Sequence, residues 1–311
     1  MKKPPILQEY CLYCNYLAPK GRERLCFLGE QLAQRHLTFH DRLIGIVGGA
    51  GSGKSSLIKG MFPGLSLAND DDGLDQHKIM QVNALPEDIG SATTLHLDMR
   101  FQTAFSQPYQ VADFVRAALE RGRRVIVEHF DLLYPSLKIN ADMLIGIGDE
   151  ILIVRPNVFG PLPSSVYDIV FASLQRRKAA HTLEHLAIHL LENEFAIDES
   201  TFYSTDIAGG FVLRFTLKPD IDLNLLEARL KETIAQNLPS AYVDEEHLKV
   251  GNLTLHCNGP RIHVHNTSEI GPFKIIKQLV YDEKTATHCL LGLLGGQDES
   301  NLYNLNKINM R

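Results

Sequence analysis

The sequence lacks tryptophan, holds only five cysteines among its 311 residues, and contains no run of eighteen apolar residues. Without such a run we expect no membrane-spanning helix. The opening MKKPPILQEY turns polar too soon for a signal peptide. Five cysteines are too few, and odd in number, for a disulfide scaffold of this length, so we expect a reducing, cytoplasmic location.

Basic charge is also scarce, because 31 lysines and arginines face 37 aspartates and glutamates. The net charge of −6 argues against a protein that binds nucleic acid through bulk electrostatics. The remaining composition, 44% hydrophobic and 22% charged, is that of a globular protein with at least one large core. A length of 311 residues then favours two domains.

The order of strand-like and helix-like segments separates these domains. Strands alternate with helices up to about residue 155, which predicts an α/β domain whose parallel sheet is covered by helices on both faces. A long helix near 164–194 and a set of alternating strands follow, which predict an α+β domain with an antiparallel sheet. We expect a helical N-terminal segment packed on the first domain at 1–40, the first domain at 41–172 and the second at 173–311.

Four segments carry specific predictions of secondary structure. An apolar stripe at helical spacing predicts a helix near 23–36, with Leu25, Phe27, Leu28, Leu32 and Ala33 facing inward. Three further segments have the composition of strands: LSLAND at 65–70, the β-branched RRVIVEHFDLLY at 123–134, and RIHVH at 261–265.

Residues 48–55, GGAGSGKS, fit the pattern G-x-x-x-x-G-K-[ST] between an apolar strand and a helix. Glycines let backbone amides surround phosphate oxygens, and the helix directs its positive end at the same anion. Lys54 would reach the β- and γ-phosphates, and Ser55 would supply a hydroxyl to Mg²⁺. The sequence therefore predicts a site for ATP and Mg²⁺, formed by Gly48, Gly49, Ala50, Gly51, Ser52, Gly53, Lys54, Ser55 and Ser56.

The strand Val125-Ile126-Val127-Glu128 resembles a segment of the uridine kinase and phosphoribulokinase family, in which an apolar strand ends in Glu-Gly. The resemblance implies an α/β P-loop kinase domain in which Glu128 contacts Mg²⁺ or substrate. His129 stands where the family has glycine, a departure that affects the geometry of the substrate site.

The same resemblance implies a catalytic base, an aspartate after the strand that follows the phosphate-loop helix. Such a carboxylate takes the proton of the acceptor hydroxyl. Asp70 and Asp71 occupy the expected position, with Asp72 and Asp98 as alternatives. The family's arginine-rich lid is not evident, and its nearest candidates are Arg176 and Arg177.

His181 and His185 lie one helical turn apart in HTLEHL at 181–186, a spacing that lets two imidazoles hold one Zn²⁺. HTLEHL resembles the motif H-T-x-x-H-L that opens the editing domain of alanyl-tRNA synthetases and of free-standing deacylases. FVLRFTLK, ETIAQNLP and CNGPRIHVHNTSEIGPFKII continue this resemblance in the family's order. It implies a zinc site formed by His181, His185, Cys257 and His263. Here the family's C-x3-H has become C-x5-H, and the two extra residues would displace the thiolate unless the loop adjusts.

Three functions follow from these motifs. The favoured one is an ATP- and Mg²⁺-dependent phosphotransferase acting on a nucleoside or another small hydroxyl compound, with Lys54, Asp70, Asp71 and Glu128 as catalytic residues. The second is a zinc-dependent deacylase of aminoacyl-tRNA with a nucleotide-sensing P-loop domain, the one case that requires tRNA as a partner. The third is a non-catalytic nucleotide switch.

Overall fold

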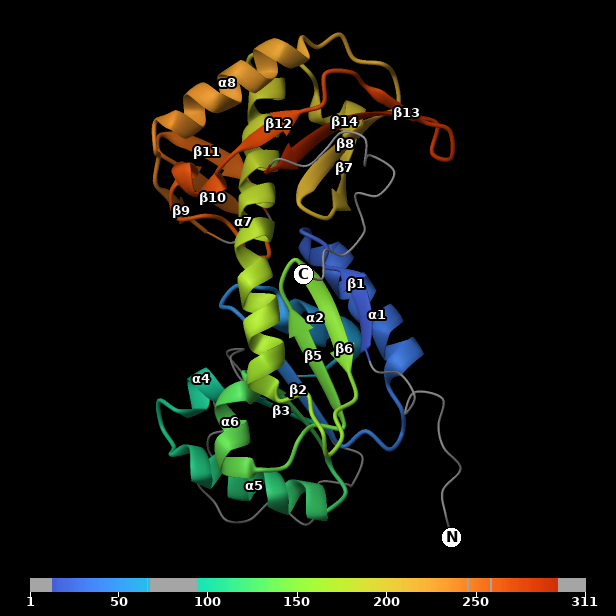
Figure 1. The fold of residues 1–311 in the computed structure, drawn as a ribbon, viewed down its shortest axis with the longest axis vertical. Helices are drawn as coiled ribbons and strands as arrows, with labels where there is room; N and C mark the ends of the chain where they lie inside the picture. The colour runs from blue at the N-terminus through green and yellow to red at the C-terminus, as the bar shows by residue number, and fades with distance from the viewer. Residues whose placement is uncertain (1–12, 66, 68–93, 245, 258, 296–311) are drawn as a thin grey trace. The chain divides into compact units, whose positions relative to one another are not determined.

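The computed structural model describes residues 13–65, 67, 94–244, 246–257 and 259–295. These residues divide into two compact units, one within 1–16 and 23–172 and the other within 17–22 and 173–311. Helix α7 (Pro163–Asn193) contributes residues to both units (Figure 1). The first unit ends at Ala172, inside this helix, and the short segment 17–22 belongs to the second unit.

The first unit contains a six-stranded sheet in the order β1-β6-β5-β2-β4-β3. Its strands are β1 (Tyr13–Leu17), β2 (Leu43–Gly48), β3 (Thr94–Asp98), β4 (Arg124–Glu128), β5 (Met143–Ile147) and β6 (Glu150–Val154). Strands β3, β4, β2 and β5 are parallel, but β6 is antiparallel to β5. The prediction of a purely parallel sheet is therefore wrong, because the two-residue turn Gly148-Asp149 is too short for a parallel crossover. Strand β1, within the N-terminal segment predicted as helical, was not anticipated.

Helices of the first unit cover a sheet that is buried on both faces, since every residue of β2 and β5 is buried. The helices are α1 (Arg22–His36), α2 (Lys54–Met61), α4 (Met99–Gln102), α5 (Pro108–Glu120), α6 (Phe130–Leu137) and the first part of α7. Val115 of α5, Leu133 of α6 and Val170 of α7 share one core with the sheet residues Val47 and Val127. The first unit is thus a mixed α/β fold.

Residues 123–134 do not form a single strand as predicted. Strand β4 ends at Glu128, His129 adopts the left-handed conformation (φ 56°, ψ 47°), and α6 begins at Phe130. Phe130, Leu133 and Leu137 are buried and follow each other at helical spacing, which favours a helix over a continued strand.

Helix α1 packs on α2 through two glycines. A Cβ atom on Gly29 would lie 2.4 Å from the carbonyl oxygen of Leu57, and one on Gly60 would lie 1.9 Å from that of Cys26. The thiol of Cys26 donates a hydrogen bond to the carbonyl oxygen of Ser56 over 3.2 Å. Gly29 therefore takes the inward position predicted for Phe27, whose side chain is 64% exposed.

Gly60→Ala provides a test of this close packing. Alanine normally stabilises a helix by about 1 kcal/mol relative to glycine, but here the new methyl group would force α1 and α2 apart. We expect the free energy of unfolding to fall by about 2 kcal/mol, as for other overpacked cores. Chemical denaturation measures the change, and Lys59→Ala, at an exposed position of the same helix, is the control. A more stable Gly60→Ala protein would contradict the packing described.

The second unit contains two antiparallel sheets, as the sequence predicted. The larger has the order β12-β14-β8-β7, with β13 also paired to β14, and the smaller has the order β11-β10-β9. The strands are β7 (Phe202–Ile207), β8 (Gly210–Phe215), β9 (Ser240–Tyr242), β10 (His247–Val250), β11 (Leu253–His256), β12 (Phe273–Ile275), β13 (Val280–Asp282) and β14 (Thr287–Leu294).

The second part of α7 and helix α8 (Leu223–Ala235) form one core with these sheets. Glu227 of α8 accepts a hydrogen bond from the backbone N–H of Ile275 over 2.8 Å and pairs with Lys231 and Lys277. Burial acts to raise the pKa of Glu227, but these hydrogen bonds lower it to about 2. The carboxylate thereby fastens α8 to β12. Among the described residues, none of the helices has the length and hydropathy that crossing a membrane requires.

Residues 261–265 form a loop, so the predicted strand RIHVH is wrong. Its backbone finds other partners: the N–H of Val264 donates to Thr182 Oγ1 over 3.1 Å, and the carbonyl oxygen of His265 accepts from the N–H of Ser240 over 2.8 Å. Ile262, His263 and Val264 are all buried. The alternating pattern of a strand is therefore absent at this point.

Candidate functional site

The predicted phosphate loop, residues 48–55, has the backbone that its glycines allow. Gly53 precedes α2 with φ 97°, and a Cβ atom on Gly48 would lie 2.7 Å from the carbonyl oxygen of Ile147. Helix α2 begins at Lys54, and no side chain caps its first turn. Lys54 is 5% exposed, and its ammonium group donates a hydrogen bond of 2.9 Å to the carbonyl oxygen of Gly49. The loop thus presents a helix N-terminus beside a buried lysine, an arrangement suited to an anion.

Glu128 lies at the end of β4, next to the loop between β2 and α2. Ser55 Oγ donates a hydrogen bond of 3.0 Å to Glu128 Oε1, and Lys54 Nζ lies 4.0 Å from Oε2. Nε2 of His96, from β3, lies 3.3 Å from Oε1. Glu128 is the last residue of β4, at the carboxyl end of the parallel strands, where α/β sheets bind ligands. His96 has no local signal in the sequence, because only the pairing of β3 with β4 brings it to Glu128.

Burial and charge set the protonation of this cluster. Burial acts to raise the pKa of Glu128, but His96, Lys54 and Ser55 outweigh it and hold the pKa below its ordinary value. Burial lowers the pKa of Lys54, and the negative charges of Glu128 and Asp98 offset part of the shift. A hydroxyl and an ionised carboxylate are oxygen ligands of the kind that Mg²⁺ prefers.

His129 and the nearby acids complete the described part of this site. Burial lowers the pKa of His129 to about 3, helped by the positive charges of Lys54 and Arg100, so its imidazole is neutral at physiological pH. Burial raises the pKa of Asp131. Asp98 pairs in register with Glu128 across β3 and β4, and it caps α4 by accepting from the N–H of Arg100 over 2.9 Å. The predicted bases Asp70 and Asp71, with their alternative Asp72, lie outside the described residues.

The second unit gathers the four predicted metal ligands, His181, His185, Cys257 and His263, with one ligand atom of each within 4.8 Å of the others. Cys257 Sγ lies 3.2 Å from His263 Nε2 and 3.5 Å from His181 Nε2. The two extra residues between Cys257 and His263 therefore do not displace the thiolate. Three imidazole nitrogens and one sulfur can hold a metal ion, and all but His185 are buried.

The proton of His263 is fixed by Thr182, which the sequence did not single out although it lies within HTLEHL. Thr182 Oγ1 donates to the carbonyl oxygen of Lys178 over 2.9 Å, and so it accepts from His263 Nδ1 at 3.2 Å. His263 consequently carries its proton on Nδ1 and turns the lone pair of Nε2 toward Cys257. Metal-binding histidines commonly have such a partner behind the ring.

The protonation of two of these ligands follows from their surroundings. Burial, with the neighbouring rings of His181 and His185, places the pKa of His263 well below its ordinary value, so its imidazole is neutral. Burial raises the pKa of the Cys257 thiol. A metal ion therefore finds a neutral imidazole ready to bind, whereas the thiol must release its proton.

No family model and no curated protein matches this chain. Among solved structures, one similar chain is N-acetylornithine aminotransferase from Stenotrophomonas maltophilia K279a. It is 12% identical, and the alignment covers 82% of this chain and 71% of that chain with a TM-score of 0.18. A TM-score this low carries no argument about fold or function.

Thr182→Val tests how the metal site is organised. Valine keeps the shape of threonine but cannot accept from His263 Nδ1, so the ring would lose its fixed tautomer. We expect the affinity for Zn²⁺ to fall about tenfold, the lower end of the usual effect of such partners. Competition with a chromophoric chelator measures the affinity, and Thr182→Ser, which keeps the hydroxyl, should bind like the wild type. Equal affinity in the valine variant would show that the hydroxyl plays no part.

Proposed function

We propose that the chain is a Mg²⁺-dependent phosphotransferase that transfers the γ-phosphoryl group of a nucleoside triphosphate to a small hydroxyl compound, such as a nucleoside. The observation that carries the proposal is the 3.0 Å hydrogen bond between Ser55 and Glu128, beside the buried Lys54. It joins the hydroxyl of a phosphate loop to a carboxylate at the end of the neighbouring strand. In this P-loop reading of the first unit, the two oxygens would share one Mg²⁺ ion.

Each residue of the cluster has a role in this reaction. Lys54 would exchange its contact with Gly49 for the β- and γ-phosphates, and Ser55 and Glu128 would hold Mg²⁺ directly or through water. An ion held there would supply positive charge that stabilises the phosphoryl group during transfer. Among the described residues, Asp98 would accept the proton of the acceptor hydroxyl, while Asp70, Asp71 and Asp72 remain predicted alternatives.

This proposal predicts that Lys54→Ala and Glu128→Gln each lower nucleoside-stimulated ADP formation about 100-fold, the usual cost of losing one preorganised charge-stabilising group. Formation of ADP from ATP and Mg²⁺ is measured across a panel of nucleosides. Lys59→Ala, on the exposed side of α2, should retain full activity. The proposal fails if no nucleoside or other small hydroxyl compound stimulates ADP formation, or if Lys54→Ala leaves it intact.

A second function, zinc-dependent hydrolysis of aminoacyl-tRNA, is favoured by the one observation that Cys257 joins the three histidines despite its altered spacing. In the editing-like reading of the second unit, the cluster would hold Zn²⁺. Four protein ligands, however, close a tetrahedral site and are typical of structural zinc, whereas catalytic zinc keeps one position for water. Hydrolysis would therefore require one ligand to leave, and His185 is the least buried of the four.

Metal content and deacylation together distinguish these roles. We expect elemental analysis to find one zinc ion per chain, lost in His181→Ala. If the second function is correct, the protein releases alanine or serine from charged tRNA, and both His181→Ala and chelation abolish the release. Zinc without deacylation would instead indicate a structural ion. A protein that binds no zinc would overturn the metal centre itself.

A further inference from the structure

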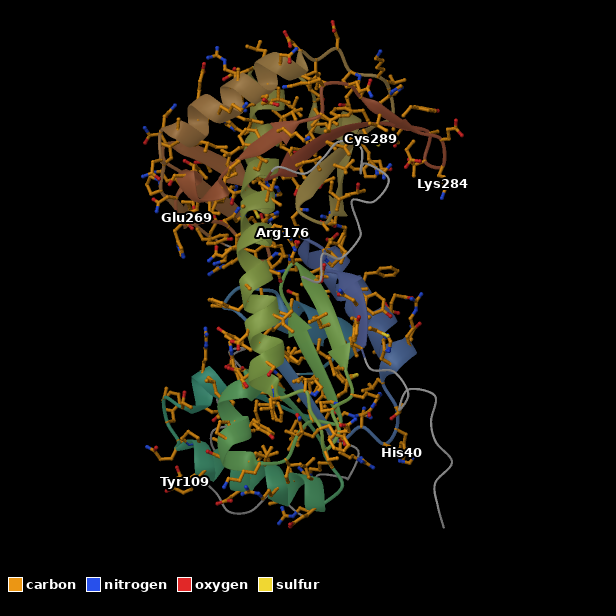
Figure 2. The ribbon with its side chains drawn as sticks, viewed as in Figure 1. His40, Tyr109, Arg176, Glu269, Lys284 and Cys289 are labelled. Carbon is orange, nitrogen blue, oxygen red and sulfur yellow. The ribbon has the colours of Figure 1, made fainter. Side chains whose placement is uncertain are left out.

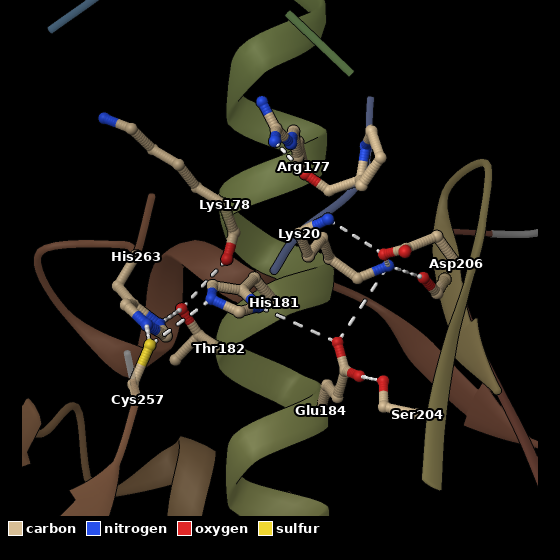
Figure 3. Close-up of polar contacts among 12 residues, drawn as sticks. Lys20, Arg177, Lys178, His181, Thr182, Glu184, Ser204, Asp206, Cys257 and His263 are labelled. Atoms are coloured by element: carbon tan, nitrogen blue, oxygen red, sulfur yellow. Dashed lines mark hydrogen bonds and ion pairs between the residues drawn. The ribbon is translucent and has the colours of Figure 1, made fainter. Parts of the chain in front are cut away.

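The residues that precede α1 contribute to the second unit, although they lie far from it in the sequence. Within the segment 17–22, Lys20 is 3% exposed, and its ammonium group donates a hydrogen bond of 2.8 Å to the carbonyl oxygen of Gly210. The same group lies 3.4 Å from Asp206 Oδ1 and 3.9 Å from Glu184 Oε2 (Figure 3). Lys20 is therefore held between the β7–β8 hairpin and α7.

Glu184 connects this lysine to the metal site. It lies on α7 between the ligands His181 and His185 in sequence, and it is 3% exposed. Its Oε2 lies 3.7 Å from Nδ1 of His181, and its Oε1 accepts a hydrogen bond from Ser204 Oγ. Figure 3 shows the resulting order: Lys20 and Ser204 contact Glu184, which faces one side of the His181 ring, while Cys257 faces the other.

The segment 17–22 also contacts the loop that carries the other ligands. The backbone N–H of Arg22 donates a hydrogen bond of 3.0 Å to the carbonyl oxygen of Gly259, between Cys257 and His263. Arg177 is fully buried and donates a hydrogen bond to the carbonyl oxygen of Pro19. The segment 17–22 thus contacts both α7 and the loop at 257–263, which together carry the four candidate metal ligands.

We propose that Glu184 and Lys20 are positioning residues of the metal centre. Glu184 orients His181 by attracting the proton of Nδ1, which leaves the lone pair of Nε2 for the metal. Lys20, with Ser204, holds the buried carboxylate in place for this task. The proposal rests on the metal centre proposed above but on neither of the two reactions, since it concerns metal binding alone.

The physical basis is the cost of burying Glu184. A carboxylate this far from water needs compensating charge and hydrogen bonds, which Lys20 and Ser204 supply on the side away from His181. Carboxylate–histidine–metal arrangements fix the tautomer of the ring and raise its basicity. Thr182 serves His263 in this way, and Glu184 is the group in the matching position behind His181.

The test compares the full-length wild type with Glu184→Gln, Lys20→Met and the double variant. Zinc affinity is measured by chelator competition, and the absorption spectrum of the Co²⁺-loaded protein reports ligand geometry. We expect Glu184→Gln to lower zinc affinity about tenfold and to alter the Co²⁺ bands. Lys20→Met should cause a smaller loss, which disappears in the Glu184→Gln background because Lys20 acts through Glu184.

The matched controls are Glu192→Gln, on the same helix, and Lys178→Met, whose side chain points away from Glu184 in Figure 3. Both should bind zinc like the wild type. Thermal melting of the metal-free proteins shows whether a variant has simply unfolded. If Glu184→Gln or Lys20→Met does not fold, Ser204→Ala, which removes only one hydroxyl, takes its place in the test. We expect Ser204→Ala to lower zinc affinity as well.

Three results would overturn the proposal. Wild-type affinity and Co²⁺ spectrum in folded Glu184→Gln would reduce the network to a structural role. Additive losses in the double variant would remove Lys20 from the proposal, because it would then act independently of Glu184. Absence of metal binding by the wild type would overturn the metal centre as well. This result is distinguishable from the first two, because in those the wild type binds metal.

Discussion

Each candidate site depends on one glutamate that is held almost completely out of water. Glu128 and Glu184 have the same three kinds of neighbour: a lysine, a serine and a histidine. The neighbours are Lys54, Ser55 and His96 around Glu128, and Lys20, Ser204 and His181 around Glu184. A buried carboxylate without such partners would cost several kcal/mol. The need to compensate its charge therefore fixes the surrounding side chains, and through them the shape of each site.

The two glutamates nevertheless differ in the groups that lie beyond these neighbours. Beside Glu128 stand a hydroxyl and a helix N-terminus, which suit a hard cation accompanied by phosphate. Glu184 stands behind an imidazole whose neighbours are two further imidazoles and a thiol, which suit a softer ion such as zinc. The two sets of side chains therefore suit different kinds of metal ion.

Short-range patterns could be predicted from the sequence, and long-range contacts could not. The predicted phosphate loop and the pair His181 and His185 depend on spacing within a few residues, so the strand, turn and helix that carry them could be predicted from the sequence. The family resemblance added Cys257 and His263. His96 and Lys20 have no local signal, because their importance arises only when separate segments fold together. The prediction of one strand at 123–134 was wrong, because the β-branched residues end at β4, His129 is left-handed, and a helix begins at Phe130.

The segment 17–22 has a consequence for the inheritance of this protein. A gene fragment that begins at residue 173 would leave behind Lys20 and the backbone donor of Arg22, both of which contact groups of the second unit. That unit could not have been exchanged between proteins as one uninterrupted stretch without losing these contacts. Its two parts flank residues 23–172 in the sequence, so one uninterrupted gene fragment that encodes both parts must also encode those residues.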